Sequence, residues 1–367
     1  MSQTTNYDSI LGHFLLEGTV KEVKPLGNGL INDTLKVNTV EDDKPDYVLQ
    51  RINNSVFPDV GLLQHNIEVV TDHIREKLTE RGEDDIDRKC LRFIKTKEGK
   101  TYFEDPEGKY WRVSVFIPRS KTFESVTPET SYACGKMFGD FENMLSDIKE
   151  PLGETIKDFH NMELRAQQLR DVVKEDPNGR VQEPDVQALL ADIRRDVDEM
   201  CKAERLYREG KLPKRICHCD TKVNNMMYDE NDKPLCVIDL DTVMPSFVFS
   251  DYGDFLRTAA NFVAEDDPHF DQVGFNPEIF KSFTKGYLES ARSFLTPIEI
   301  ENLPYAVALF PFMQSVRFLW DYINGDKYWK VKYPTHNLVR AQNQMVLYKS
   351  VRHNDQMMAD YIKSLLK

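Results

Sequence analysis

The 367-residue sequence predicts a two-lobed α+β fold, in which a strand-rich first third precedes a mainly helical remainder. Short segments of alternating polarity, separated by glycine turns, dominate up to Pro118, and segments with helical apolar spacing dominate after Lys121. Proline cannot donate to a β ladder, so the sheet is expected to end at Pro118. One polar hairpin, at 217–241, interrupts the helical part. We therefore predict an N-terminal lobe over 1–118 and a C-terminal lobe over 119–367.

The N-terminal lobe is predicted to carry most of the strands. A helix is expected over 7–16, which ends before Gly18, and a loop followed by a long amphipathic helix is expected over 57–81. A glycine-rich turn at 25–34 joins the first two strands and does not match a Walker P-loop. Since glycine lets a backbone approach a ligand closely, this turn has the form of a flap over phosphates. Strands are expected at 19–23, 35–38, 47–52, 91–93, 101–103 and 110–117.

The C-terminal lobe is predicted to be helical apart from the hairpin. Thr127 followed by Pro128 is typical of a helix N-terminus, and Ser250 is another expected N-cap. The helices are expected over 127–148, 159–173, 184–210, from 250 onward, 277–291, 297–323 and 335–366.

Composition and charge exclude several classes of partner. Lys plus Arg number 48 and Asp plus Glu number 61, and this net charge of −13 opposes binding to nucleic acid or to an anionic membrane. No secretory signal and no transmembrane segment is predicted. The six cysteines are scattered, as is typical of reduced thiols, and Cys217-His218-Cys219 lacks a second pair at zinc spacing. We expect a cytoplasmic monomer.

The hairpin at 217–241 carries the strongest chemical signal. His218, Asp220 and Asn225 have the H-x-D-x4-N spacing of a phosphotransferase catalytic loop, and a short apolar run then leads to Asp239. Phosphoryl transfer needs a carboxylate that orients the attacking hydroxyl and takes its proton. It also needs an amide oxygen and a second carboxylate that hold magnesium on the nucleotide phosphates.

Each of these residues therefore has an expected role. We assign Asp220 as the catalytic base and Asn225 and Asp239 as magnesium ligands, and we expect Lys222 to place a positive charge on the transferring phosphoryl group. The alternative is an ordinary hairpin with a polar turn at 231–234. It does not explain why two acids and an amide flank the turn at this spacing. With the two-lobed pattern, this predicts a kinase that uses ATP and Mg²⁺.

The nucleotide is expected to contact the N-terminal lobe and the segment that follows it. In kinase-like lobes the third strand carries a cation towards the α- and β-phosphates, and Arg51 is the cation available there. An exposed strand arginine is the alternative. Glu68 of the following helix is a candidate partner for Arg51, with Glu76 as a competitor. The segment 118–125 is expected to bind adenine through its backbone groups.

Longer motifs resemble one known group of enzymes. The motifs H-C-D-T-K-V-N-N-M, V-I-D-L-D-T-V-M-P-S and S-D-Y-G-D-F-L-R-T-A-A-N resemble the aminoglycoside phosphotransferase and choline kinase superfamily. More narrowly, the chain resembles the bacterial N-acetylhexosamine 1-kinases over essentially its whole length. The stretches that carry this narrower resemblance are L-G-N-G-L-I-N-D-T at 26–34, V-L-Q-R-I-N at 48–53, F-I-P-R-S at 116–120 and R-F-L-W-D-Y-I-N-G-D-K-Y-W-K at 317–330.

The resemblance implies a protein-kinase-like fold of the aminoglycoside phosphotransferase type. It implies transfer of the γ-phosphoryl group of ATP to the anomeric hydroxyl of N-acetylglucosamine or N-acetylgalactosamine. It also implies that Asp254 hydrogen-bonds the catalytic-loop backbone. Cys219 stands where aminoglycoside kinases usually have glycine, and Arg51 stands where many relatives have lysine, a change that keeps the charge. The residues predicted to bind the nucleotide are Gly27, Asn28, Gly29, Asn32, Arg51 and Phe116.

The acceptor is expected to meet the hairpin and the C-terminal helices. Arg317, Trp320 and Asp321 combine polar groups with a flat aromatic face that suits a sugar. The alternative is that Trp320 belongs to the core and that Arg317 and Asp321 form an i,i+4 pair. Asp220 and Asp241 complete the predicted substrate residues. Asp241 has three roles that stay open: it faces the sugar, it faces the metal ion, or it caps the following turn.

Two other functions remain open from the sequence. One is a related small-molecule kinase for an amino alcohol or an aminoglycoside, because the acidic chain suits a cationic acceptor. The other is a nucleotide- or sugar-binding protein without activity, which has no need of a base. A protein kinase is disfavoured, because no A-P-E segment follows Asp239.

Overall fold

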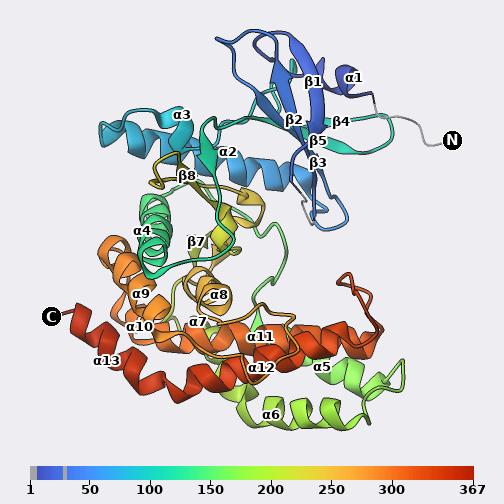
Figure 1. Ribbon diagram of the computed structural model, residues 1–367, viewed down its shortest axis with the longest axis vertical. Coiled ribbons are helices and arrows are strands. Elements are labelled where there is room, and N and C mark those ends of the chain that lie inside the picture. Colours follow the sequence, from blue (N-terminus) through green and yellow to red (C-terminus); the bar gives the residue numbers. More distant parts are fainter. Residues whose placement is uncertain (1–5, 28–30) are drawn as a thin grey trace. The chain divides into compact units, whose positions relative to one another are not determined.

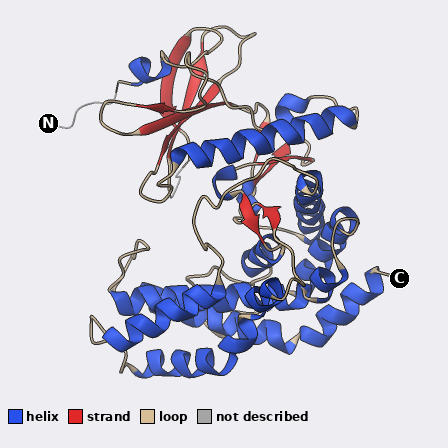
Figure 2. Ribbon diagram, turned by 180° about the vertical axis from the view of Figure 1, so that it is seen from behind, coloured by secondary structure: helices blue, strands red, loops and turns tan. Residues whose placement is uncertain are grey.

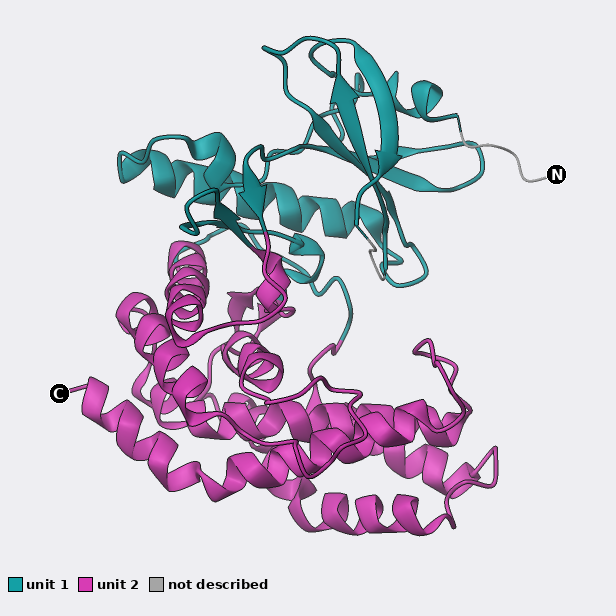
Figure 3. Ribbon diagram, in the orientation of Figure 1, with its two compact units in different colours: residues 1–121, 147–157, 227–244 teal, residues 122–146, 158–226, 245–367 magenta. Residues whose placement is uncertain are grey.

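The structure is a computed structural model that describes residues 6–27 and 31–367 (Figure 1). Asn28 and Gly29, which were predicted to bind the nucleotide, lie outside the described residues. The chain has the predicted α+β fold, with sheets and a largely helical remainder (Figure 2). It divides into two compact units (Figure 3). Unit 1 comprises Met1–Lys121, Asp147–Lys157 and Met227–Met244, and unit 2 comprises Thr122–Ser146, Asp158–Met226 and Pro245–Lys367.

Unit 1 contains a five-stranded antiparallel sheet in the order β1-β2-β3-β5-β4. The predicted strands at 19–23, 35–38, 47–52 and 110–117 are confirmed, whereas 91–93 contributes only a bridge from Phe93 to Ser114. The elements of this unit are α1 (Tyr7–Leu11), β1 (Val20–Pro25), β2 (Asp33–Thr39), β3 (Tyr47–Ile52), α2 (Val60–Glu80), α3 (Ile86–Lys89), β4 (Phe103–Glu104), β5 (Tyr110–Val115), β6 (Ser120–Lys121), β9 (Pro234–Val237) and η2 (Leu240–Thr242).

The two faces of this sheet have different partners. Leu49 of β3 and Val113 of β5 point into an apolar core to which α1 contributes Ile10 and Leu11. Arg112 precedes Val113, and because alternate residues of a strand face opposite sides, it points to the other face. There its guanidinium donates a hydrogen bond to Gln64 of α2. The guanidinium of Arg112, from β5, therefore lies on the α2 face of the sheet.

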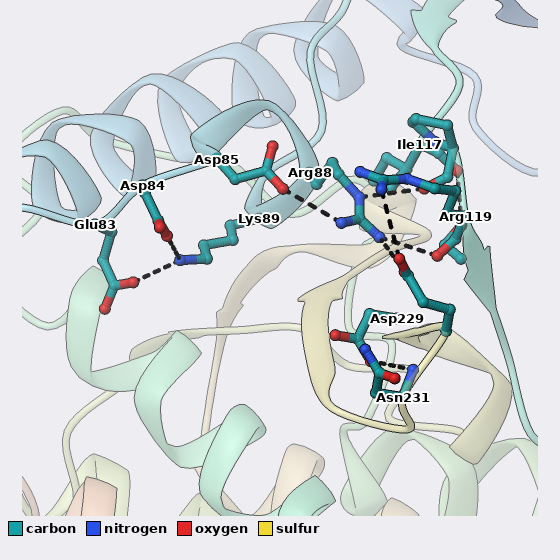
Figure 4. A network of polar contacts seen from close by, with 12 residues as sticks. Glu83, Asp84, Asp85, Arg88, Lys89, Ile117, Arg119, Asp229 and Asn231 are labelled. Atoms are coloured by element: carbon teal, nitrogen blue, oxygen red, sulfur yellow. Dashed lines mark hydrogen bonds and ion pairs between the residues drawn. The ribbon is translucent and has the colours of Figure 1, made fainter.

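Arg88 of α3 ties two further segments of unit 1 together (Figure 4). Its guanidinium donates to the carbonyl oxygens of Pro118, at 3.2 Å, and Arg119, at 2.9 Å. It also pairs with Glu230, at 3.2 Å, in the turn between β8 (Met226–Asp229) and β9. This network fastens the hairpin that leads to Asp239 onto the end of the five-stranded sheet.

Unit 2 is mainly helical. The predicted helices are present, and breaks at Cys201, Asn302 and Asn354 divide three of them. Its elements are α4 (Pro128–Leu145), α5 (Met162–Glu175), α6 (Pro184–Met200), α7 (Lys202–Arg208), β7 (Arg215–Cys217), η1 (Val223–Asn225), α8 (Phe249–Ala259), α9 (Pro277–Ala291), α10 (Pro297–Glu301), α11 (Leu303–Asn324), α12 (His336–His353) and α13 (Asp355–Leu365), with β10 (Met244–Ser246) beginning at the last residue of unit 1.

Helices α4 and α9 pack backbone against backbone. A Cβ atom on Gly286 would lie 2.1 Å from the carbonyl oxygen of Tyr132, and one on Gly135 would lie 2.1 Å from that of Phe283. Only a hydrogen atom fits at these two positions, so the glycines permit the close approach. Among residues 6–27 and 31–367, every helix is too short or too polar to cross a bilayer.

Candidate active site

The predicted base and the predicted amide ligand lie on one loop of unit 2. This loop follows β7 and ends in η1. Asn225 Nδ2 donates to the carbonyl oxygen of Asp220 at 2.8 Å, and Lys222 Nζ lies 2.8 Å from Asp220 Oδ1. Because the nitrogen of the Asn225 amide is used in this bond, its oxygen is the atom turned towards other partners. The loop thus brings together the carboxylate, the ammonium and the amide that the spacing predicted.

Asp251 of α8 holds the backbone of this loop. It is fully buried, and its two carboxylate oxygens each accept a backbone N–H at 2.7 Å, from His218 and from Cys219. The Thr221 hydroxyl also donates to the Asp251 carbonyl at 2.7 Å. The expectation that Asp254 performs this role is wrong. Asp254 lies one helical turn further on and pairs instead with Arg257 at 2.9 Å.

Cys219 has a backbone conformation that favours glycine. Its φ angle is 62°, in the left-handed region, which costs an L-residue roughly 1–2 kcal/mol. The hydrogen bond from its N–H to Asp251 holds this conformation in place. The conformation gives a physical reason for the glycine that the resembling aminoglycoside kinases usually carry at this position.

Replacing Cys219 with glycine is therefore expected to preserve activity, with kcat within about threefold of the parent. Cys219→Val places a β-branched residue at positive φ and is expected to lower the free energy of unfolding by about 2 kcal/mol or more. Denaturant titration and steady-state kinetics of both variants check this. Equal loss of stability in the two variants would contradict the backbone argument.

Glu142 of α4 is a second buried acid and lies close to Asp251. Burial, followed by the negative charge of Asp251, raises the pKa of Glu142 well above its ordinary value, so Glu142 is protonated and hydrogen-bonds to Asp251. The hydroxyl of Tyr287 of α9 donates to Glu142 Oε2. Cys217 Sγ is close to both acids, but burial raises the pKa of its thiol as well. This cluster is therefore better suited to share a proton than to bind a metal ion.

The raised pKa of Glu142 predicts how stability depends on pH. The folded state binds this proton more tightly than the unfolded chain, so the stabilising effect is complete below about pH 4.5 and is lost as the pH rises towards the folded pKa. Glu142→Gln keeps a donor towards Asp251 and removes the proton. We expect the free energy of unfolding of the variant to fall less steeply above pH 5, by up to about 1.4 kcal/mol per pH unit. Unfolding curves from pH 5 to pH 9 measure this slope, and identical slopes would contradict the assignment.

The predicted metal ligand Asp239 lies in unit 1, at the end of the hairpin. Strands β8 and β9 pair, and the turn between them is closed by the Asp229 N–H, which donates to the Lys233 carbonyl at 2.8 Å. The predicted hairpin is therefore present. Asp239 adopts φ 61° immediately after it, and η2 follows. The role of Asp239 as a magnesium ligand stays a prediction.

Asp241 has a different environment from the one expected of a substrate residue. Its side chain is 5% exposed, Arg112 Nη1 lies 2.5 Å from Oδ1, and Asn32 Nδ2 donates to Oδ2 at 2.7 Å. The carboxylate is thus held on both oxygens inside unit 1. These contacts give Asp241 a structural role in unit 1, and its assignment to the substrate stays a prediction.

Three of the predicted nucleotide residues line one hollow of about 480 Å³ in unit 1: Gly27, Asn32 and Arg51. Arg51 has the same strand parity as Leu49, so it lies on the α1 face of the sheet. It pairs with Asp33, its cross-strand neighbour, at 2.5 Å. The expected pairing of Arg51 with Glu68 is therefore wrong, while its contact with phosphates stays a prediction.

Phe116, the last predicted nucleotide residue, follows β5. Its backbone N–H donates to the Asp46 carbonyl at 2.9 Å, and the ammonium of Lys36 lies 4.0 Å from its ring centre. In the adjoining segment, Arg88 already engages the carbonyls of Pro118 and Arg119 (Figure 4). The N–H of Phe116 and these two carbonyls therefore already have protein partners.

Arg317 and Trp320 line one pocket of about 110 Å³ in unit 2. The Arg317 guanidinium donates to Gln314 at 2.8 Å, rather than to Asp321, and lies over the ring of Trp329 at 5.2 Å. The sequence reading missed several members of this pocket, although two of them stand in the quoted 317–330 motif. The missed residues are Arg165, Gln168, Tyr328 and Trp329.

Asp321 supports this pocket from behind. Its fully buried carboxylate accepts backbone N–H groups from Lys327, Tyr328 and Trp329 at 2.9–3.0 Å, and the amide of Asn337 at 2.9 Å. Both oxygens thus accept hydrogen bonds from the protein, and a direct contact of Asp321 with the sugar stays a prediction. Asp321 holds in place the loop that carries Tyr328 and Trp329, two aromatic residues that line the pocket.

Removing the Asp321 carboxylate should therefore weaken acceptor binding. Asp321→Ala leaves the loop without its anchor, and we expect a loss of about 1–2 kcal/mol of acceptor binding, or roughly 10–30-fold in acceptor KM. KM for ATP should be unchanged. Asp192→Ala, which removes a half-buried carboxylate of α6 paired with Lys349 and Arg195 away from this pocket, is the matched control. An unchanged acceptor KM for Asp321→Ala would contradict the role.

His160 lies within electrostatic reach of both the base and the pocket. Burial, followed by the positive charge of Arg317, lowers its pKa well below the ordinary value, and Asp220 acts on it in the opposite direction. The imidazole is therefore neutral at pH 7. Its Nδ1 lies 3.0 Å from the Ser250 hydroxyl, which in turn lies 2.8 Å from the Ser246 hydroxyl.

The α+β fold is that of a kinase-like phosphotransferase. More narrowly, the chain belongs to the phosphotransferase enzyme family (APH), whose model matches residues 22–278.

Solved structures show the same fold. An aminoglycoside phosphotransferase from Alicyclobacillus acidocaldarius is 14% identical with a TM-score of 0.61, over 97% of this chain and 98% of that one. Amicoumacin kinase hAmiN, in complex with AMP-PNP, Ca²⁺ and Ami, is 14% identical with a TM-score of 0.55, over 90% of each chain. A Plasmodium vivax ethanolamine kinase is 15% identical with a TM-score of 0.52, over 87% of this chain and 80% of that one.

Proposed function

We propose that this protein transfers the γ-phosphoryl group of ATP to the anomeric hydroxyl of N-acetylglucosamine or N-acetylgalactosamine. The observation that carries the proposal is the catalytic loop of unit 2, in which Asp220, Lys222 and Asn225 are held by mutual contacts. Asp220 orients the acceptor hydroxyl and takes its proton. Lys222 counters the negative charge that gathers on the transferring group. The N-acetylhexosamine itself rests on the resemblance of the motifs.

Asn225 and Asp239 fit a magnesium ion by their chemistry. Magnesium takes oxygen ligands and is usually held by one or two carboxylates together with substrate phosphates. Because Asn225 Nδ2 donates a hydrogen bond to the loop backbone, the amide oxygen is the atom of that side chain that can coordinate the metal ion. When bound, the ion would neutralise charge on the phosphates of ATP. The complex of hAmiN with AMP-PNP and Ca²⁺ supports a nucleotide and a divalent cation in this fold.

The charge of the unit 2 pocket supports a neutral acceptor. Among the described residues that line it, two are arginines and none is an acid. Burial lowers the pKa of Arg165 to about 10 and lowers that of Arg317, and both remain charged at neutral pH. Two guanidinium groups repel an ammonium acceptor, and they donate hydrogen bonds to hydroxyl or acetamido oxygens. Trp320 and Trp329 offer flat apolar faces beside them.

The alternative is a kinase for an aminoglycoside or an amino alcohol. The acceptors of the solved relatives favour it, since their names include aminoglycoside and ethanolamine. The two arginines that line the pocket, Arg165 and Arg317, argue against a cationic acceptor. The net charge of −13 attracts cations at long range, but local charges decide which acceptor stays bound.

An acceptor panel tests the proposal. ADP release from ATP and Mg²⁺ is measured with N-acetylglucosamine, N-acetylgalactosamine, glucose, galactose, choline, homoserine and kanamycin. We expect turnover with the N-acetyl sugars only, and a product that has lost its reducing end. Turnover of choline, homoserine or kanamycin alone would replace the proposal with the alternative. ATP binding without turnover of any acceptor would remove the catalytic assignment.

A further inference from the structure

A buried hydrogen-bond network in unit 1 surrounds the ion pair between Arg112 and Asp241. Asp241 lies two residues after the proposed metal ligand Asp239 in the sequence. The Arg112 side chain is 3% exposed. Besides its ion pair with Asp241, the guanidinium donates hydrogen bonds to Gln50 of β3 at 2.9 Å and to Gln64 of α2 at 3.2 Å. The guanidinium is thus committed to three protein partners on the α2 face of the sheet. It has no surface left for a nucleotide phosphate.

The turn that contains Asp239 is held at several further points. Asp239 itself has φ 61°, a conformation that needs support from its surroundings. The Thr155 hydroxyl donates to the Asp241 carbonyl at 2.9 Å, and Asn66 of α2 donates to the Val243 carbonyl at 2.9 Å. Together with Arg112, these contacts fix η2 and the residues around it to β5, to α2 and to the segment 147–157.

Asn32 connects the same carboxylate to the end of the flap. Its amide nitrogen donates to Asp241 Oδ2 at 2.7 Å, and its oxygen accepts the backbone N–H of Asn53 at 2.9 Å. Asn32 immediately precedes β2 and lines the same hollow as Gly27. One carboxylate therefore joins the start of β2, strand β5 and the turn after the hairpin.

We infer that Arg112 and Asp241 are positioning residues for the phosphoryl transfer, because their ion pair sets the turn that presents Asp239 to magnesium. This inference rests on the proposed function of Asp239 as a metal ligand. Stability alone is a poor reason for such a pair, since a buried ion pair can often be replaced by apolar residues without loss of stability. Removing only one partner is expected to be destructive, because it leaves a buried charge uncompensated.

The test uses the full-length chain and separates metal binding from folding. The double variant Arg112→Met/Asp241→Leu replaces both charges by apolar side chains of similar size. Binding of Mn²⁺ to the protein–ADP complex is followed by electron paramagnetic resonance, together with ADP binding without metal, Tm, and the Mg²⁺ dependence of ADP release. Asp105→Asn is the matched control, because Asp105 accepts the indole N–H of Trp111 in the same sheet unit and lies outside this network.

We expect the double variant to fold with a lowered Tm, because Gln50, Gln64 and Asn32 lose partners. We expect it to bind ADP without metal as the parent does, and to bind Mn²⁺ at least about tenfold more weakly. The control should change Tm without changing Mn²⁺ binding. A folded double variant with parental Mn²⁺ affinity overturns the inference.

A second variant tests the inference if the double variant does not fold, and the Mn²⁺ measurement is independent of the acceptor. If the double variant does not fold, Arg112→Lys decides, since it keeps the charge and cannot reach all three partners. Weaker Mn²⁺ binding in Arg112→Lys supports the inference, and parental binding overturns it. The Mn²⁺ measurement needs no acceptor, so absent turnover in the acceptor panel would count against the proposed function and leave this test intact.

Discussion

Asp220→Asn is expected to lower kcat by about 10²–10⁴ while leaving the fold intact. The asparagine has nearly the same shape and still accepts a hydrogen bond, but it cannot take the proton of the acceptor hydroxyl. Its loss of the ion pair with Lys222 should change stability by less than about 1 kcal/mol, since both side chains are partly exposed. The variant thus separates the chemical role of Asp220 from any structural one.

The measurement is single-turnover formation of ADP with saturating acceptor, accompanied by Tm and by KM for ATP. Asp232→Asn is the matched control, because it makes the same chemical change in the turn of the following hairpin. Asp232 has φ 64°, a conformation that asparagine tolerates, and its partner is the exposed Lys121. We expect the control to keep kcat within about twofold. A parental kcat for Asp220→Asn would require another residue as the base.

The local geometry of the loop 218–225 was predictable because its contacts join residues close in the sequence. His218, Asp220 and Asn225 span eight positions of the sequence, and one turn of backbone brings the amide of Asn225 back to the Asp220 carbonyl. The strand and helix pattern was predictable for the same reason, since periodicity reflects burial along each segment. Contacts between distant segments were harder to predict.

The choice between Asp251 and Asp254 shows this limit. The two aspartates are three residues apart on α8, so they share one stripe of the helix surface. The sequence places both on the buried side, and only the packing of α8 decides which one meets the loop. The hydrogen bonds to His218 and Cys219 select Asp251.

Strand parity decides which arginine of the sheet faces α2. Strand β3 carries apolar residues on both faces, and its pattern does not indicate the face of Arg51. Strand β5 alternates Trp111, Arg112 and Val113, which indicates a polar face that contains an arginine. That signal was present and was missed. Asp321 had no comparable signal, because its ligands are backbone N–H groups and not side chains of a particular type.

Asp251→Ala is expected to lower both stability and activity. It leaves the buried N–H groups of His218 and Cys219 without acceptors, at about 1–3 kcal/mol each, or roughly 2–6 kcal/mol in the free energy of unfolding. The residue after Cys219 is Asp220, the proposed base, so a displaced loop also moves Asp220. A misplacement of about 1 Å at the reacting atoms lowers kcat by roughly 10²-fold.

Activity must therefore be measured where the variant is fully folded, at a temperature set by its own unfolding curve. Thr221→Val is the graded control, because it removes only the hydrogen bond to the Asp251 carbonyl and keeps the shape of the side chain. We expect Thr221→Val to lose about 1 kcal/mol of stability with little change in kcat. If folded Asp251→Ala retains the parental kcat, the loop keeps its shape without this carboxylate. The position of Asp220 would then depend on its contacts with Lys222 and Asn225 alone.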